Sequence, residues 1–94
     1  MPPRFTWNRD KAAGNEAKHG VTFEEAASVF RDQFAHIFDD DRHSDDEYRE
    51  IIIGQSDHQR ILIASFTERE GTIRIISARK ATNRERIDYE SQKR

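Results

Sequence analysis

The chain has 94 residues, 34% of them hydrophobic and 36% charged, and a formal net charge of −2. This length allows one small domain with a single core, and the absence of cysteine excludes disulfides and thiolate metal sites. No apolar run approaches the roughly 20 residues that span a bilayer, and no signal-peptide pattern opens the chain, so a cytoplasmic protein is expected.

The first predicted elements are a short strand and a helix. Residues 4–7 alternate between polar and apolar side chains, as a strand does. Asn8 or Asp10 can cap the following helix, in which several alanines favour the helical conformation. Gly20 is a natural end for that helix, and the basic residues in its last turn complement the helix dipole.

A second helix is predicted directly after Gly20. Thr22 and Glu25 form a capping-box pattern, in which each side chain bonds to the backbone of the other residue. The helix is expected to end near residues 31–32. Its apolar positions share one face, which predicts that it buries one side: Phe23, Ala26, Ala27 and Phe30.

The rest of the chain predicts four strands and a last helix. Strands are expected over residues 34–38, 48–53, 60–66 and 72–79, with a polar loop at 39–46, Gly54 closing the second strand, and turns at 56–58 and 70–71. Short turns between strands favour an antiparallel meander. Thr82 and Glu85 form a second capping box that begins a helix. Ile87 is expected to pack inward from this helix, with Tyr89 as a second candidate, and residues 90–94 are expected to fray. The order β-α-α-β-β-β-β-α predicts a single α+β domain over residues 1–94.

The last predicted strand is apolar on both sides. Simple alternation would place Arg74, Ile76, Ala78 and Lys80 on one side, and Ile73, Ile75, Ser77 and Arg79 on the other. We therefore expect an internal strand that is covered on both faces and presents its basic side chains at its ends. Arg74 and Ser77 are expected to be structural.

Basic residues are concentrated where this strand meets the last helix. Residues 60–94 carry nine basic and five acidic side chains, whereas residues 21–59 carry three basic and eleven acidic. Arginine matches phosphate oxygens in two-point geometry, and a helix N-terminus offers free N–H groups, so the junction predicts a phosphate site. Two alternatives remain open. The fold could mix these charges evenly, and Arg84 and Arg86 could pair with Glu85, Asp88 or Glu90 on a solvated helix.

His19 is a candidate proton carrier because imidazole exchanges protons near neutral pH. A single histidine at a helix end is more often a surface residue that complements the dipole. His36, His43 and His58 show no metal-ligand spacing, so neither a metal nor a cofactor is expected.

Several blocks of the sequence resemble the BrnT toxins, and the resemblance extends over nearly the whole chain. The two most specific blocks are Lys18-His19-Gly20-Val21-Thr22-Phe23-Glu24-Glu25-Ala26 and Arg74-Ile75-Ile76-Ser77-Ala78-Arg79. Shorter matches are Phe5-Thr6-Trp7-Asn8, Asn15, Thr67-Glu68-Arg69, Glu85-Arg86 and Tyr89. Asn8 departs from the aspartate usual in the family, but both side chains can cap a helix.

The resemblance implies the toxin half of a bacterial type II toxin–antitoxin pair. BrnT proteins resemble RelE-type ribonucleases, in which helices pack on a small antiparallel sheet, and they inhibit translation by cutting RNA. Their partner BrnA carries a ribbon-helix-helix region that binds operator DNA, so a heterotetramer with a BrnA-like antitoxin is expected. Contact with DNA would occur through the antitoxin alone, and no membrane association is expected.

Metal-independent RNA cleavage requires a base, cations that stabilise the phosphorane and an acid. The hypothesis assigns Arg69 and Arg79 to the phosphate, assisted by Arg84 or Arg86. The acid–base candidates are His19, Glu68 and Glu85. Candidates for further RNA contacts are Lys11, Lys18, Lys80, Arg86 and Tyr89, the last by base stacking. Phe5 and Trp7 could also stack on a base, but burial in the core is the stronger expectation for both.

Two other functions remain compatible with the sequence. The basic face could bind RNA or the ribosome without cutting, so that inhibition is stoichiometric. It could instead serve only to dock an acidic antitoxin segment, in which case the isolated domain would not bind RNA in a salt-sensitive way.

Overall fold

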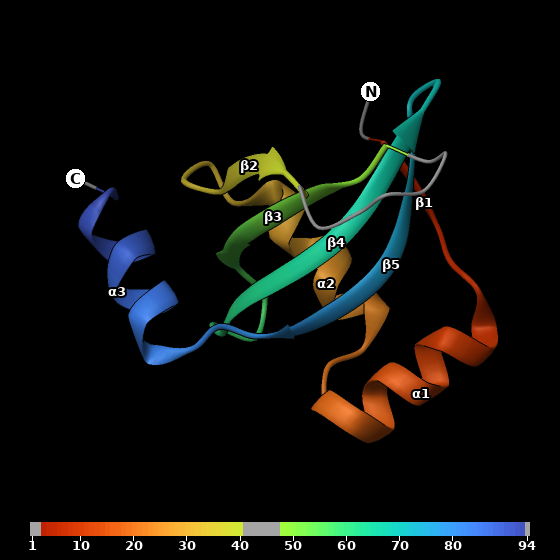
Figure 1. Ribbon diagram of the computed structural model, residues 1–94, viewed down its shortest axis with the longest axis horizontal. Helices are drawn as coiled ribbons and strands as arrows, with labels where there is room; N and C mark the ends of the chain where they lie inside the picture. Colours follow the sequence, from red (N-terminus) through yellow and green to blue (C-terminus); the bar gives the residue numbers. More distant parts are fainter. Residues whose placement is uncertain (1–2, 41–47, 94) are drawn as a thin grey trace.

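The computed structural model describes residues 3–40 and 48–93. Figure 1 shows its elements, which follow the order β1 (Arg4–Thr6), α1 (Arg9–His19), α2 (Phe23–Ser28), the 3₁₀ turn η1 (Val29–Arg31), β2 (His36–Asp39), β3 (Glu50–Gln55), β4 (Ile61–Arg69), β5 (Thr72–Lys80) and α3 (Asn83–Ser91). The predicted α+β class and element order are confirmed. Most of the predicted polar loop, residues 41–46, lies outside the described residues.

The strands form one five-stranded sheet in the order β1-β5-β4-β3-β2. Strands β2 to β5 make the predicted antiparallel meander. Strand β1, whose place in the sheet the sequence did not indicate, lies parallel to β5 and pairs only with residues 72–74. Beyond Arg74, therefore, no strand among the described residues covers the outer edge of β5.

One face of the sheet carries the hydrophobic core. Helices α1 and α2 pack against β5, while η1 packs against β3 (Figure 1). The fully buried side chains come from the segment after α1 and from alternate positions of the three inner strands: Val21, Phe23, Ala26, Val29, Ile52, Leu62, Ala64, Phe66 and Ile75. Phe30 joins this core edge-to-face with Phe66, with 4.9 Å between ring centroids. The predicted apolar face of the second helix is thus confirmed.

The helix caps follow the local sequence closely. The Asn8 side chain accepts from the backbone N–H of Lys11 at 3.0 Å, and Gly20 adopts the left-handed conformation that ends α1 (φ 69°). The full capping box between Thr82 and Glu85 is present. At the start of α2 only half of the predicted box forms, because the Glu25 side chain turns to other partners and only the Thr22 side chain caps.

Helix α3 lies at the end of the sheet, away from α1 (Figure 1). Its inward residue is Tyr89, which is buried and donates a hydrogen bond to Asp32. The prediction that Ile87 packs inward is wrong, since 59% of its surface is exposed. No helix in the described part of the chain is long and apolar enough to cross a membrane.

Gly54 does not close its strand as predicted. Strand β3 continues through it to Gln55. The segment from η1 to β2 passes directly over Gly54, which leaves no room for a side chain. A Cβ atom on Gly54 would lie 2.9 Å from both Ala35 Cβ and Val29 Cγ1, closer than carbon atoms can approach. The glycine therefore permits close packing rather than a turn.

A β-bulge in β5 corrects the predicted faces of that strand. Ser65 pairs with Ser77 and Phe66 with Ile75, so Ile76 is an extra residue without a partner. After the bulge the alternation shifts by one position. Ala78 consequently joins Ile73 and Ile75 in the core, while Ser77 and Arg79 face the opposite side of the sheet.

Candidate active site

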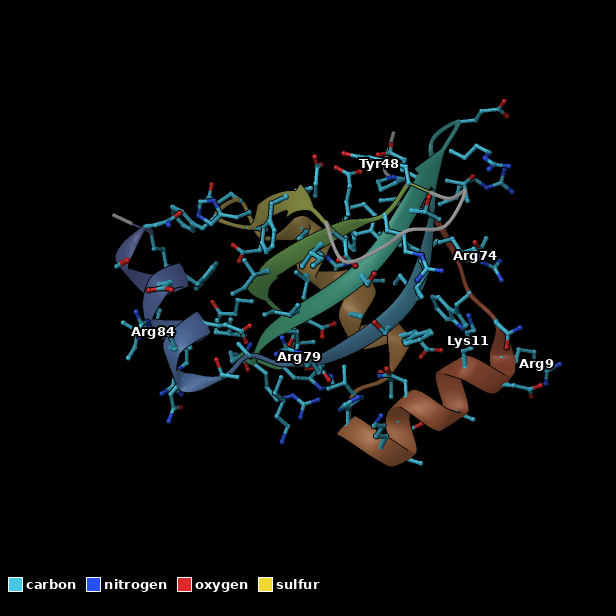
Figure 2. All side chains as sticks on the ribbon, viewed as in Figure 1. Arg9, Lys11, Tyr48, Arg74, Arg79 and Arg84 are labelled. Carbon is cyan, nitrogen blue, oxygen red and sulfur yellow. The ribbon has the colours of Figure 1, made fainter. Side chains whose placement is uncertain are left out.

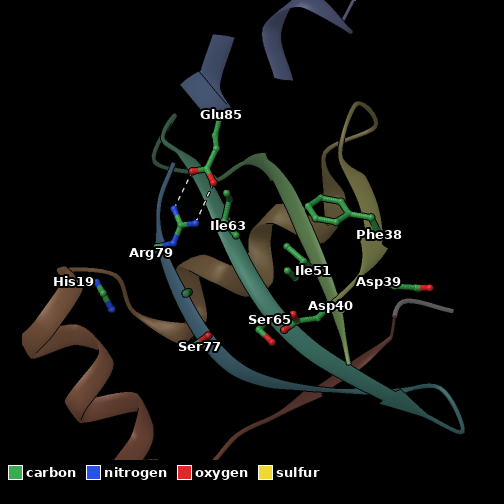
Figure 3. A pocket seen from close by; sticks show the side chains of 11 residues that line it. His19, Phe38, Asp39, Asp40, Ile51, Ile63, Ser65, Ser77, Arg79 and Glu85 are labelled. Carbon is green, nitrogen blue, oxygen red and sulfur yellow. Dashed lines mark hydrogen bonds and ion pairs between the residues drawn. The ribbon is translucent and has the colours of Figure 1, made fainter. Parts of the chain in front are cut away.

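The face of the sheet opposite the core carries a pocket of about 540 Å³. Its floor comes from the middle strands, and its walls from the C-terminal end of α1 and the start of α3. Figure 3 shows His19, Arg79 and Glu85 on one side of this pocket and Phe38 on the other, with Ile51 and Ile63 between them. Two polar side chains, Ser65 and Ser77, complete the floor.

The centre of the pocket is an ion pair between Arg79 and Glu85. The guanidinium donates from Nη1 to Oε1 at 2.9 Å and from Nη2 to Oε2 at 3.0 Å (Figure 3). These bonds lower the pKa of Glu85 to about 2 and raise the pKa of Arg79. A carboxylate with this pKa is a poor proton acceptor at neutral pH. The geometry therefore favours Glu85 as the residue that orients Arg79 rather than as a general base.

Arg79 keeps donors for a ligand despite this pairing. A guanidinium has five N–H groups. Two bond to Glu85, and a third reaches the backbone oxygen of Lys80 at 3.2 Å. Within the described residues, Nε–H and the second hydrogen of Nη2 have no protein acceptor. Together they offer a two-point contact for one phosphate.

His19 is held in place by a buried asparagine on the same helix. Asn15 lies one turn earlier, so both side chains point towards β5. The Asn15 amide donates to the carbonyl oxygen of Ala78 at 2.8 Å and accepts from the N–H of Ala78 at 3.0 Å. It also donates to the carbonyl of Val21 at 3.0 Å. The side chain thus takes the place of a paired strand on the edge of β5 and fixes α1 beside Arg79.

A second set of bonds holds the turn after His19. Arg60 donates to the backbone oxygen of Gly20 at 3.1 Å and pairs through two bonds with Glu25, which is only 3% exposed. The bonds from Arg60, helped by one from Ser56, lower the pKa of Glu25. Glu25 is therefore ionised at neutral pH and keeps Arg60 on Gly20.

Two of the predicted catalytic residues lie far from this pocket. Arg69 pairs with Thr72 at the opposite end of β5. Seven residues of extended strand separate Thr72 from Arg79, a span of roughly 23 Å. Glu68 lies at that same end, where its charge and that of Asp39 add to burial in raising the pKa of Glu50. Arg69 and Arg79 cannot bind one phosphate, so this part of the prediction is corrected.

The predicted RNA-binding cations divide between the two ends of α1. Lys18 is exposed beside His19, and Lys80 is exposed directly after Arg79. Lys11 lies two turns from His19, and Figure 2 shows it near Arg9 and Arg74, away from Arg79. On α3, Arg84 and Arg86 are exposed, and Arg86 bonds to Asn83 at 3.3 Å.

The aromatic candidates for base stacking are in the core. Tyr89 is 2% exposed, so its predicted stacking on a base does not fit its position. Trp7 packs edge-to-face on Phe23, and Phe5 packs on Phe30, as the alternative interpretation expected.

Four side chains that shape the pocket were not assigned to it from the sequence. Ser65 and Phe38 reach it through the pairing register of distant strands, which the sequence did not reveal. Ser77, expected to be structural, lies on its floor because of the bulge. One feature of the sequence could have pointed to Asn15, because asparagine is a weak helix former and here stands in the middle of a helix. In the described part of the chain no three His, Asp or Glu side chains are grouped as metal ligands would be.

Comparisons with known proteins agree with this architecture. A family model described as the ribonuclease toxin BrnT of a type II toxin–antitoxin system matches residues 7–85. The crystal structure of the Brucella abortus ribonuclease toxin BrnT is similar at 23% sequence identity and a TM-score of 0.65, over 86% of this chain and 99% of that one. No match was found among curated proteins. Since the family model spans most of the sequence, the chain belongs to the BrnT family of ribonuclease toxins of type II toxin–antitoxin systems.

Proposed function

We propose that this chain cuts single-stranded RNA without a metal ion, using the pocket between α1, β5 and α3. The observation that carries the proposal is the placement of Arg79 and His19 in one pocket, with two N–H groups of Arg79 available. Arg79 would bind the phosphate and His19 would carry a proton, which are two of the functions that 2′-hydroxyl chemistry requires. Lys18 and Lys80 flank the pocket and attract the RNA backbone.

The reaction needs no protein nucleophile. The 2′-oxygen of RNA attacks the adjacent phosphorus, the 2′-hydroxyl loses its proton to a base, and the bond from phosphorus to the 5′-oxygen breaks as that oxygen gains a proton. Arg79 binds the non-bridging oxygens, where charge accumulates in the transition state. His19 exchanges one of the two protons, and solvent water exchanges the other. The products carry a 2′,3′-cyclic phosphate and a 5′-hydroxyl, and DNA is not cut because it lacks the 2′-oxygen.

Family membership supports the biological setting of this reaction. We propose that the chain inhibits translation by cutting RNA and that a BrnA-like antitoxin with a ribbon-helix-helix region neutralises it. Two copies of each protein would form a heterotetramer that contacts operator DNA through the antitoxin.

The test is cleavage of a labelled single-stranded RNA and its DNA counterpart by antitoxin-free protein in excess EDTA. We expect RNA to be cut to cyclic-phosphate ends and DNA to be spared. Arg79→Ala should lower kcat/KM at least about 100-fold, the usual effect of removing a donor to the developing charge. Arg69→Ala is the matched control, because it removes the same charge about 23 Å away and should change kcat/KM less than about threefold.

Two results would contradict the proposal. If the protein binds RNA but substoichiometric amounts of it do not cut the RNA, it is a stoichiometric inhibitor. Equal losses in Arg69→Ala and Arg79→Ala would mean that the pocket described here is not where cleavage occurs.

A further inference from the structure

The pocket around Arg79 continues into a second, apolar part. A neighbouring hollow of about 390 Å³ shares Phe38, Ile63 and Glu85 with it and extends to α3. The two hollows are continuous because two cross-strand rows of residues run side by side over this face. One row is Arg79, Ile63, Ile53 and His36, and the other is Ser77, Ser65, Ile51 and Phe38. Each row is polar at β5 and ends on the edge strand β2.

Phe38 is the exposed aromatic residue of this groove, whereas Tyr89, which also lines it, is buried. Half of its surface is exposed, whereas Ile51 beside it on β3 is 8% exposed. Figure 3 shows its ring facing Ile51 and Ile63 across from Arg79. An exposed ring backed by aliphatic side chains is a platform on which a flat apolar ligand can stack.

The charges of the groove distinguish its two ends. Arg79 occupies one end, whereas Asp39 and Asp40 border the end at Phe38. These two carboxylates disfavour a phosphate at the Phe38 end of the groove. Three strand spacings, roughly 14 Å between backbones, separate β5 from β2, and the side chains of Arg79 and Phe38 shorten that gap. A nucleotide next to the bound phosphate can therefore place its base on Phe38.

We propose that Phe38, backed by Ile51 and Ile63, is a stacking site for one nucleobase adjacent to the phosphate held by Arg79. This inference rests on the proposed function, since it assigns the RNA a direction across the sheet. It predicts a base contact that tolerates all four bases.

The test is equilibrium binding of a short single-stranded RNA with methylated 2′-hydroxyls, which the protein binds but cannot cut. Stacking on one side chain contributes about 1–3 kcal/mol, so Phe38→Ala should raise Kd roughly 5- to 150-fold. Phe38→Tyr keeps the ring and should bind within about twofold of wild type. Ile87→Ala is the control, because Ile87 is similarly exposed but lines neither hollow.

A second perturbation leaves the protein unchanged. In a series of RNA oligomers, one base is removed at each position in turn. At one position, removal of the base should weaken binding to the wild-type protein as much as Phe38→Ala weakens binding to the intact oligomer. The variant should lose nothing further with that oligomer, because the base and the ring then form one interaction.

Three outcomes would overturn the inference. If Phe38→Ala binds RNA normally while cleavage still depends on Arg79, the stacking site is wrong and the proposed function stands. If Phe38→Ala weakens only the complex with the antitoxin, the groove docks protein instead. If the wild-type protein binds no RNA, both the stacking site and the proposed function fail.

Discussion

At the scale of single residues, Glu85 has two tasks. Its carboxylate accepts from the backbone N–H of Thr82 at 2.8 Å, which caps α3, and it also pairs with Arg79. The start of the helix and the phosphate ligand are therefore fixed by one side chain. Because both interactions require the ionised form, they keep Glu85 charged far below the pH at which a free glutamate gains its proton.

This coupling predicts how stability depends on pH. The pKa of Glu85 is lowered from 4.5 to about 2 in the folded chain, so its contribution is complete above pH 4.5 and disappears as the pH falls through 2. Wild type should therefore lose more unfolding free energy than Glu85→Gln between these pH values. Urea denaturation in steps from pH 7 to pH 2 measures the difference.

Subtracting the Glu85→Gln curve from the wild-type curve removes the contributions of the other acidic residues to the pH dependence. Glu25 and Asp32 also have lowered pKa values, and both titrate in both proteins. Their effects cancel when the two curves are subtracted. A difference that stays constant over the whole range would show that Glu85 has no special interaction in the folded state.

At the scale of elements, Asn15 joins α1 to β5. Removing its amide leaves the N–H and the carbonyl of Ala78 without partners in a buried position. Asn15→Ala should therefore reduce the unfolding free energy by about 2–4 kcal/mol. Because the contact also sets the position of His19, kcat for RNA cleavage should fall while KM changes little. Urea denaturation and saturation kinetics measure the two effects.

Ser28→Ala is the control that separates stability from activity. Ser28 is equally buried, donates to the carbonyl of Glu25 at 2.6 Å and accepts from the N–H of Asp57 at 2.9 Å. It does not line the pocket that holds His19. This variant should be destabilised but keep its kcat. An equal loss of kcat in both variants would show that Asn15 acts on stability alone.

The sequence predicted those elements whose determinants are local. The caps at Asn8, Gly20 and Thr82 depend on side chains within a few residues, and all three are present. The parallel pairing of β1 with β5 depends on residues almost 70 positions apart, and no local pattern indicated it. Ile87 was misplaced because helical periodicity is weak in α3, where tertiary contacts decide which side faces inward.

The same distinction applies to the candidate site. Arg79, Glu85 and His19 were found because their motifs are short and chemically specific. Arg69 was grouped with Arg79 because the two are close in sequence, although Arg69 ends β4 beside the turn and Arg79 lies at the far end of β5. Phe38 was missed because only the register of three strand pairs brings it to the pocket.

At the scale of the whole molecule, cations gather at two separate places. Arg79, Lys18 and Lys80 lie around the pocket, while Lys11 and Arg74 lie towards the other end of α1 (Figure 2). The acidic residues Asp39, Glu50 and Glu68 lie close to one another, since the charges of Asp39 and Glu68 both act on Glu50. Around the pocket the cations form a short basic site rather than a continuous basic face.

A short site predicts a weak dependence of RNA binding on salt. Three phosphate contacts give a slope of about −2 in a plot of log K against log salt concentration. Lys18→Ala should make this slope shallower by about 0.7, and Lys11→Ala should leave it unchanged. Fluorescence anisotropy over a range of potassium chloride concentrations measures both slopes. An equal change in the two variants would mean that the RNA follows α1 along its full length.

The unpaired Ile76 means that spacing within β5 is itself part of the site. Substitutions alter one side chain, but if Ile76 took a regular place in the ladder instead of bulging, every later side chain would turn over. Arg79 and Ser77 would then enter the core, and Ala78 would face the pocket. Loss of the bulge would therefore dismantle the pocket even if every side chain that lines it were kept.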